Sequence, residues 1–124
     1  MAGKKKILVV DDEPNILKLI EFILKNAGYD VVVAANGADC IRKAKAEKPD
    51  MIVLDVMMPG MDGFEVARKL TKDAAALSVP ILMLSSKAQF EDKMKGIDSG
   101  ATDYITKPFD KEDLVQKVKE CLEE

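Results

Sequence analysis

The stretch ILVVDD, residues 7–12, joins four aliphatic residues directly to two aspartates. A short apolar run with no polar alternation is typical of a strand that is buried on both faces. Similar runs follow along the chain, the last of them weaker, at residues 31–34, 51–54, 81–84 and 104–106. The sequence therefore predicts five short strands, most of them buried within a sheet.

The segments between these runs carry apolar residues at the three- and four-residue spacing of amphipathic helices. Pro14 suits the first turn of the first helix, and Gly28 suits its end. We expect helices at residues 14–27, 38–45, 63–72, 90–99 and 114–122. Strands that alternate with helices imply right-handed crossovers onto a parallel sheet. The predicted fold is therefore α/β, a three-layer (βα)5 sandwich. Two strand orders are common for such chains, and we adopt the five-stranded flavodoxin-like order 2-1-3-4-5 because it fits this length.

The chain length and composition fit a single globular domain. The 124 residues are 48% hydrophobic and 33% charged, a balance that can form a core and excludes the disordered classes. We therefore expect one domain over residues 1–124, with a core over about residues 5–122. The formal net charge of −3 argues against direct binding to nucleic acid through bulk positive charge.

Other classes of protein are excluded by what the sequence lacks. No apolar run approaches the length that spans a bilayer, and no signal peptide is apparent, so we expect a cytoplasmic protein with no membrane contact. Cys40 and Cys121 are too few and too far apart for a disulfide framework, and we expect them on opposite faces of the sheet. The chain has no histidine, so its chemistry must use carboxylates, hydroxyls and lysines.

Polar residues follow the predicted strands at the edge where parallel sheets bind ligands. Asp11 and Asp12 follow the first strand, and Asp55 follows the third. Ser85 follows the fourth strand and Lys107 the fifth. In the order 2-1-3-4-5 the first and third strands are neighbours, so we expect the three aspartates in one crevice, with Ser85 nearby and the long Lys107 side chain reaching in.

Three carboxylates in one crevice repel one another, and a bound cation relieves the conflict. Oxygen ligands of this kind suit Mg²⁺, with Mn²⁺ as a substitute, and the remaining coordination positions suit water and a phosphoryl group. A carboxylate can also attack phosphorus to give an aspartyl phosphate. Asp55 is the best-placed nucleophile because its strand lies in the middle of the sheet. Lys107 and the Ser85 hydroxyl would then stabilise the phosphoryl oxygens.

Each of these residues also has an ordinary structural interpretation. Asp11 and Asp12 could cap the helix that follows them, and Asp55 could belong to a polar loop. Ser85 could cap a helix, and Lys107 could be a solvated surface charge. Their joint arrival at the ends of four adjacent strands is what these separate interpretations explain poorly.

Four strings extend the pattern to almost the whole chain: VVDDEP at 9–14, VLDVMMPGMDG at 53–63, PILMLSS at 80–86 and GATDYITKPF at 100–109. In order and spacing they resemble the receiver domain of two-component response regulators, of the single-domain chemotaxis-regulator type. The resemblance implies that Asp55 accepts a phosphoryl group from a sensor histidine kinase or a histidine phosphotransfer protein. It further implies that Asp11, Asp12, Asp55 and the backbone carbonyl of Met57 hold the metal ion.

The resemblance also implies a switch. Ser85 and Tyr104 would be the switch residues, and the Lys107–Pro108 peptide bond would be cis. Phosphorylation would draw Ser85 inward, and the Tyr104 ring would fill the vacated space, which would change the surface formed by the predicted helix at 90–99, the fifth strand and the last helix. The partner downstream would be an effector protein, or an output domain covalently linked in a longer parent.

Three rival functions use related chemistry or the same fold. A phosphatase of the haloacid dehalogenase type usually has a second acid two residues after its nucleophile, where this chain has Met57. A flavin-binding electron carrier needs a phosphate-binding turn after the first strand, where Asp11 and Asp12 would repel phosphate. The third rival is a docking module that is never phosphorylated, which the intact set of acids, Ser85 and Lys107 disfavours.

Overall fold

The computed structural model describes residues 4–56, 58, 60, 63–72, 79–86 and 102–123. Five parallel strands form one sheet in the order β2-β1-β3-β4-β5, which confirms the predicted fold class and strand order. The strands are β1 (Lys6–Val10), β2 (Asp30–Ala34), β3 (Met51–Asp55), β4 (Ile81–Ser86) and β5 (Asp103–Lys107). The described helices are α1 (Pro14–Asn26), α2 (Gly37–Glu47), α3 (Gly63–Lys72) and α5 (Lys111–Cys121).

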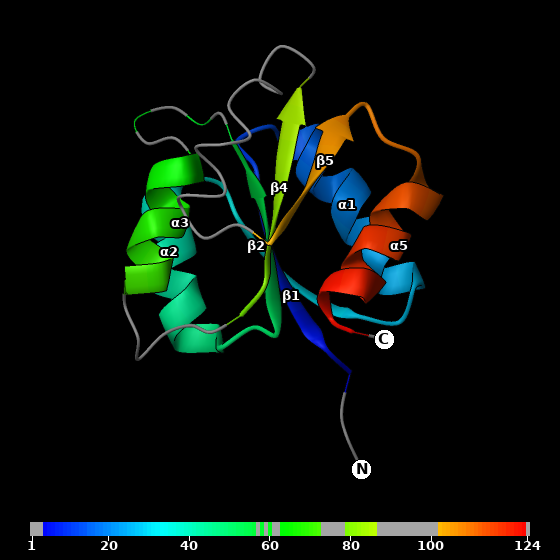
Figure 1. Cartoon of the computed structure of the whole chain (residues 1–124), viewed down its shortest axis with the longest axis horizontal. Helices are drawn as coiled ribbons and strands as arrows, with labels where there is room; N and C mark the ends of the chain where they lie inside the picture. Colours follow the sequence, from blue (N-terminus) through cyan, green and yellow to red (C-terminus); the bar gives the residue numbers. More distant parts are fainter. Residues whose placement is uncertain are drawn as a thin grey trace.

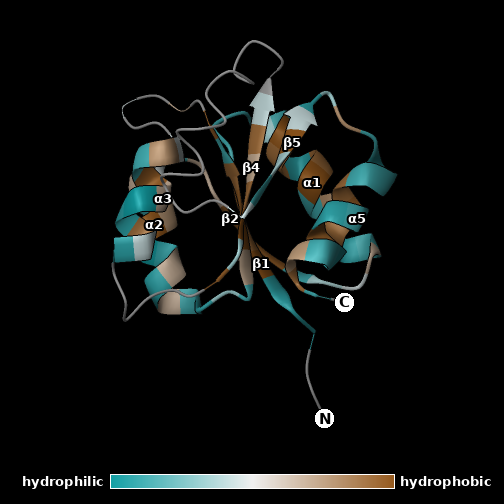
Figure 2. Cartoon of the chain, in the orientation of Figure 1, coloured by the Kyte–Doolittle hydropathy of each residue, from teal (hydrophilic) through white to brown (hydrophobic). Residues whose placement is uncertain are grey.

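The sheet lies between two layers of helices, with α2 and α3 on one face and α1 and α5 on the other (Figure 1). Successive residues of each strand therefore enter different cores. In β1, Leu8 and Val10 pack on the α2/α3 side, whereas Ile7 and Val9 pack on the α1/α5 side. The apolar colouring of the strands and of the inward helix faces in Figure 2 shows why the runs lack alternation: both faces of the sheet are covered.

Local signals fix the ends of α1 as expected. Pro14 lies in the first turn of α1, and Gly28, just beyond its end, has a φ of 100°, a conformation that glycine adopts at little cost. The Asn36 side chain caps α2 by accepting a hydrogen bond of 2.8 Å from the Asp39 N–H. Helix α2 is slightly longer than predicted, and α3 has the predicted bounds. The helix predicted at 90–99 lies outside the described residues.

Three strands extend further at their carboxyl ends than the apolar runs predicted. Asp55 pairs with Leu84, and Ser85 and Ser86 pair with Thr106 and Lys107. These polar residues therefore belong to the ends of the strands themselves and do not follow them. The apolar pattern missed this because a ladder is formed by backbone N–H and C=O groups, which every residue here provides whatever its side chain.

The two cysteines lie on opposite faces of the sheet, as predicted. Cys40 is buried in the core on the α2/α3 side, and Cys121 packs against the core on the α1/α5 side. Both are free thiols. Burial raises the pKa of the Cys40 thiol to about 12, so this side chain is a packing element and not a nucleophile.

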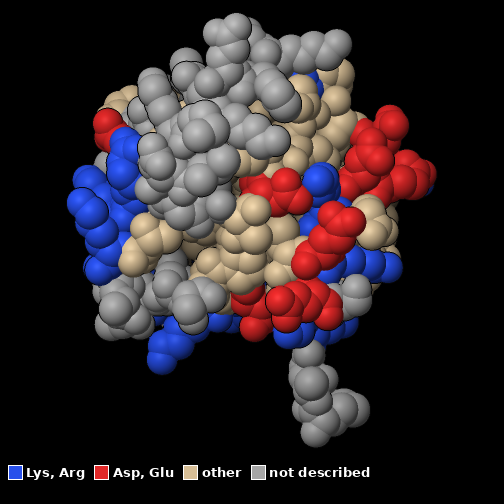
Figure 3. Space-filling model, in the orientation of Figure 1, with Lys and Arg blue, Asp and Glu red and all other residues tan. Residues whose placement is uncertain are grey.

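On the face seen in Figure 3, basic side chains gather over α3 and acidic ones around α5. Lys69 and Lys72 stand in the last turn of α3, and Glu112 and Asp113 stand in the first turn of α5. Each pair has the sign that stabilises its end of a helix dipole. This face therefore carries both signs of charge. None of the helices in the described part of the chain is long and apolar enough to cross a bilayer.

Candidate functional site

The carboxyl-terminal edge of the sheet brings Asp11 and Asp55 together. Val10 pairs with Leu54 in the register of β1 and β3. The residues that follow these two, Asp11 and Asp55, therefore lie at the same level. Both side chains are buried, with relative exposures of 0% for Asp11 and 5% for Asp55. The strand pairing, and not a loop, therefore sets the spacing of these two carboxyl groups.

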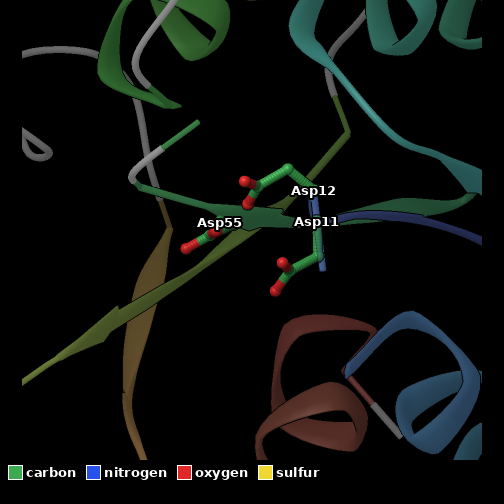
Figure 4. Close-up of side chains that lie close together, drawn as sticks. All are labelled: Asp11, Asp12 and Asp55. Atoms are coloured by element: carbon green, nitrogen blue, oxygen red, sulfur yellow. The ribbon is translucent and has the colours of Figure 1, made fainter. Parts of the chain in front are cut away.

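Asp12 completes a cluster of three acids (Figure 4). One carboxylate oxygen from each of Asp11, Asp12 and Asp55 lies within 4.8 Å of the other two. Asp12 is exposed, unlike the other two. The predicted crevice of three aspartates is therefore present, with two buried acids at its base and one solvent-facing acid at its mouth.

Lys107 reaches into this cluster from β5, as the sequence predicted. Its Nζ lies 3.0 Å from Oδ2 of Asp11 and 3.2 Å from Oδ1 of Asp55. Burial disfavours the charged ammonium, but the hydrogen bond to Asp11 and the charges of both aspartates outweigh burial, so the pKa of Lys107 is raised. Lys107 is therefore a fixed positive charge between two buried acids, and not a solvated surface lysine.

Asp11 also has a structural role at the start of α1. Its Oδ1 accepts a hydrogen bond of 2.9 Å from the backbone N–H of Glu13, while its Oδ2 accepts from Lys107. Glu13 is the N-cap residue of α1, and its own side chain makes no capping bond. The capping interpretation of Asp11 is thus partly right: one oxygen orders the entry to α1, and the other faces the site.

Ser85 and Tyr104 both lie on the α2/α3 side of the sheet. Met83 and its ladder partner Tyr104 pack with the α2/α3-side core, and the alternation of side chains along β4 places Ser85, two residues after Met83, on that side too. Ser85 is 4% exposed, and Tyr104 is half-buried. The predicted metal ligand Met57 and the switch helix at 90–99 lie outside the described residues. The Lys107–Pro108 peptide bond is cis, as the resemblance implied.

Gly63 supports the site and was missed by the sequence analysis, which treated it only as the start of a helix. Its N–H donates to the Val56 carbonyl at 2.6 Å. A Cβ atom at this position would lie 2.3 Å from the backbone oxygen of Asp55. Glycine lets α3 begin in contact with the end of β3. An Asp-Gly pair in a sequence predicts a turn, but it does not reveal a close approach of this kind.

The charges of the cluster define what it can bind. Three carboxylates and the single ammonium of Lys107 leave a formal charge of −2. Oxygen atoms from carboxylates are the ligands of hard divalent cations. The site can therefore hold such a cation next to a carboxylate that is itself a nucleophile towards phosphorus.

The sequence profile described as "Response regulator receiver domain" matches residues 7–119. This chain belongs to the response regulator receiver domain family. Receiver domains accept a phosphoryl group on an aspartate from histidine kinases in two-component signalling, and they are signalling phosphoacceptors and not metabolic enzymes. Family membership therefore favours the receiver over the phosphatase and the flavin carrier.

Relatives of this receiver domain differ in length. The alkaline phosphatase synthesis transcriptional regulatory protein PhoP of Bacillus subtilis is 48% identical over 118 residues, which are 95% of this chain and 48% of PhoP. The chain therefore spans about half the length of that regulator. Protein PilH of Pseudomonas aeruginosa is 40% identical over 117 residues, which are 94% of this chain and 97% of PilH.

A solved receiver domain has a closely similar fold. The receiver domain of the sensor histidine kinase PA1611 from Pseudomonas aeruginosa superposes with a TM-score of 0.88 at 30% identity, over 99% of this chain and 100% of that one. That domain was solved with a magnesium ion coordinated in its active site cleft.

The Gly63→Ala variant of this receiver domain should be less stable by about 1 to 3 kcal/mol, because the new methyl group would overlap backbone atoms that have little room to move. Urea unfolding measures this, and the amide NMR signals of Asp55 and Val56 should shift. Gly28→Ala is the control: it strains a turn with φ of 100° and meets nothing within 4 Å. It should cost about 1 kcal/mol and leave both signals in place. Unchanged stability and signals in Gly63→Ala would contradict the close approach.

Proposed function

We propose that residues 1–124, with a core over about 5–122, form one receiver domain that is phosphorylated on Asp55. The donor is the phosphohistidine of a sensor histidine kinase or of a histidine phosphotransfer protein. The reaction depends on Mg²⁺, and the phosphorylated surface controls a downstream partner. The observation that carries this proposal is the Lys107 ammonium held between Asp11 and Asp55, with Asp12 at the mouth of the same cluster.

The acidic cluster fits Mg²⁺. Oxygen ligands of one octahedral Mg²⁺ lie about 2.9 to 4.2 Å apart, so carboxylate oxygens within 4.8 Å of one another need only a small closure. Asp11, Asp12 and Asp55 would hold the ion, together with the backbone carbonyl of Met57, and Mn²⁺ would substitute for it. The bound ion supplies neutralisation of the negative charge on the acids and on an incoming phosphoryl group. The magnesium ion in the related PA1611 domain supports this assignment.

The transfer of the phosphoryl group needs no general base. A carboxylate oxygen of Asp55 forms a bond to phosphorus, and the bond between phosphorus and the donor imidazole nitrogen breaks. The electron pair of that bond remains on the imidazole nitrogen. Because a carboxylate nucleophile carries no proton, no base is needed to remove one, and a chain without histidine can perform the reaction.

Lys107 and Ser85 are proposed to act on the transferred group. The Lys107 ammonium lies 3.2 Å from Asp55, so a phosphoryl oxygen on that carboxylate comes within its reach. Ser85 is the next-to-last residue of the neighbouring strand β4, one residue beyond Leu84, the partner of Asp55, and its hydroxyl would donate to another phosphoryl oxygen. Preorganised donors of this kind stabilise charge in the transition state, and the same pocket would support slow autodephosphorylation.

The switch is proposed to pass from Ser85 to Tyr104. Both side chains belong to the α2/α3 side of adjacent strands, as judged from their positions in the ladder. A Ser85 hydroxyl drawn towards a phosphoryl group would leave space beside β4, and the half-buried Tyr104 ring would fill it. This amounts to a population shift between two packings, with phosphorylation favouring one.

The downstream partner is proposed to be either an effector protein or a linked output domain. PilH, which this chain matches over almost its whole length, supports the first arrangement, and PhoP, twice as long, supports the second. In neither arrangement does this domain itself contact nucleic acid or a membrane.

Incubation with acetyl phosphate and Mg²⁺ should add one phosphoryl group to the wild-type protein, and intact-mass spectrometry measures this. Asp55→Ala should gain none, because the accepting carboxylate is gone. Hydroxylamine should remove the label from the wild type, since it cleaves acyl phosphates. Asp50→Ala is the control, because this exposed acid lies at the opposite edge of the sheet and should leave the label unchanged. A label that survives Asp55→Ala, or a wild type that stays unlabelled, would overturn the assignment.

Asp12→Asn should raise the melting temperature without metal, because it removes one of three repelling carboxylates and leaves the Lys107 ion pairs intact. The same change should weaken Mg²⁺ binding by about tenfold or more, and should therefore reduce the stabilisation that Mg²⁺ gives the wild type. Differential scanning calorimetry with and without Mg²⁺ measures both effects. Equal or lower metal-free stability would contradict a crowded acidic cluster.

Mg²⁺ with beryllofluoride, a mimic of the phosphoryl group, should shift amide NMR signals beyond the crevice, including those of β5 around Tyr104. Tyr104→Ala should confine the shifts to the crevice, because no ring remains to repack, while its phosphorylation should persist. Shifts restricted to the crevice in the wild type would exclude the proposed switch and leave the phosphorylation chemistry standing.

A further inference from the structure

Strand β2 forms one edge of the sheet, because among the described strands it pairs with β1 alone. The direction of its backbone groups follows from two hydrogen bonds. The Asp30 N–H donates to the Lys5 carbonyl at 2.9 Å, and the Ala34 carbonyl accepts from the Asp11 N–H at 3.2 Å. In a parallel ladder the groups of alternate residues face the same neighbour. Asp30, Val32 and Ala34 therefore face β1, and Val31 and Val33 turn their N–H and C=O groups to the open edge.

The outward carbonyl of Val33 has a partner from a helix. The Nζ of Lys43, on α2, donates to it at 2.6 Å. The same Nζ lies 3.4 Å from Oδ2 of Asp39, one turn earlier on α2. Asp39 in turn lies next to the capped start of the helix, where its N–H donates to Asn36. The lysine is thus held over the edge by a carboxylate at a fixed place on α2.

The edge that Lys43 covers is suited to pairing with itself. Its sequence, DVVVA, has three consecutive valines, the composition that strands favour. Two copies arranged antiparallel about Val32 would place Val31 of each copy opposite Val33 of the other. Each of these two residue pairs can exchange both of its N–H···O bonds, so four hydrogen bonds could form, and two of them would need the Val33 carbonyls.

We propose that Lys43 is an edge guard, which occupies the Val33 carbonyl and thereby prevents a second copy of this chain from adding its β2 to the sheet. The ammonium occupies an acceptor that the pairing needs, and two copies would bring two such charges to the same short interface. Lysines beside open strands protect edges in this way. The proposal concerns the edge opposite β5 in the sheet order and does not depend on phosphorylation.

Lys43→Met and Lys43→Gln both remove the charge, and neither should disturb the core, since the half-buried Lys43 is not one of the residues that α2 buries. Both variants should form dimers whose fraction rises with concentration up to about 1 mM, measured by analytical ultracentrifugation. In the dimer, amide hydrogen exchange at Val31 and Val33 should slow by about fivefold or more, with no comparable change at Val32 and Ala34, which already face β1. Lys43→Arg, which keeps a charged donor, should stay monomeric like the wild type.

Lys119→Met is the matched control, because it removes one exposed lysine from α5 and leaves the edge covered. It should remain monomeric, and thermal melting should show that all variants are folded. The proposal is overturned if both neutral variants remain monomeric to about 1 mM. It is equally overturned if they dimerise without protection of Val31 and Val33, because the interface would then lie elsewhere.

Discussion

The Lys107 ammonium, set between the carboxylates of Asp11 and Asp55, is the interaction on which the site depends. Two buried acids so close together would repel each other strongly in a medium of low dielectric constant. One lysine relieves only part of this repulsion, since Asp12 adds a third carboxylate. The folded domain is therefore left with a local negative charge that a divalent cation can neutralise. A phosphoryl group can then be held between that cation and the lysine.

The sheet makes this arrangement rigid. The proposed acceptor Asp55 and the cation Lys107 are the last residues of strands whose ladders continue to those positions. Groups carried on strands are held more closely than groups on loops, and transfer of a phosphoryl group depends mainly on positioning. Gly63 adds to this by allowing α3 to start against the backbone of Asp55. The acids and the lysine are thus supported by backbone contacts on several sides.

Lysine side chains illustrate how one residue type serves different ends in this small domain. Lys107 bridges two buried acids, Lys43 covers a carbonyl at the sheet edge, and Lys117 pairs with Asp103 at 3.0 Å on the surface. Exposed pairs such as the last contribute little, about 0 to 1 kcal/mol. The role of each lysine follows from the burial and the acceptors around it.

The sequence by itself indicated the strands and the two-sided core, because apolar runs are local patterns that a chain displays directly. The strand order was chosen as the one, of two common for such chains, that fits this length. The sequence also placed Asp11, Asp55 and Lys107 at one edge, since carboxyl ends of parallel strands share an edge. Only the tertiary structure decided that Lys107 bridges both acids, that Asp11 also binds the Glu13 N–H, and that Gly63 touches Asp55. It also decided which β2 carbonyl Lys43 covers. These contacts join residues far apart in the chain or depend on the direction of single atoms, and no spacing of residue types encodes either.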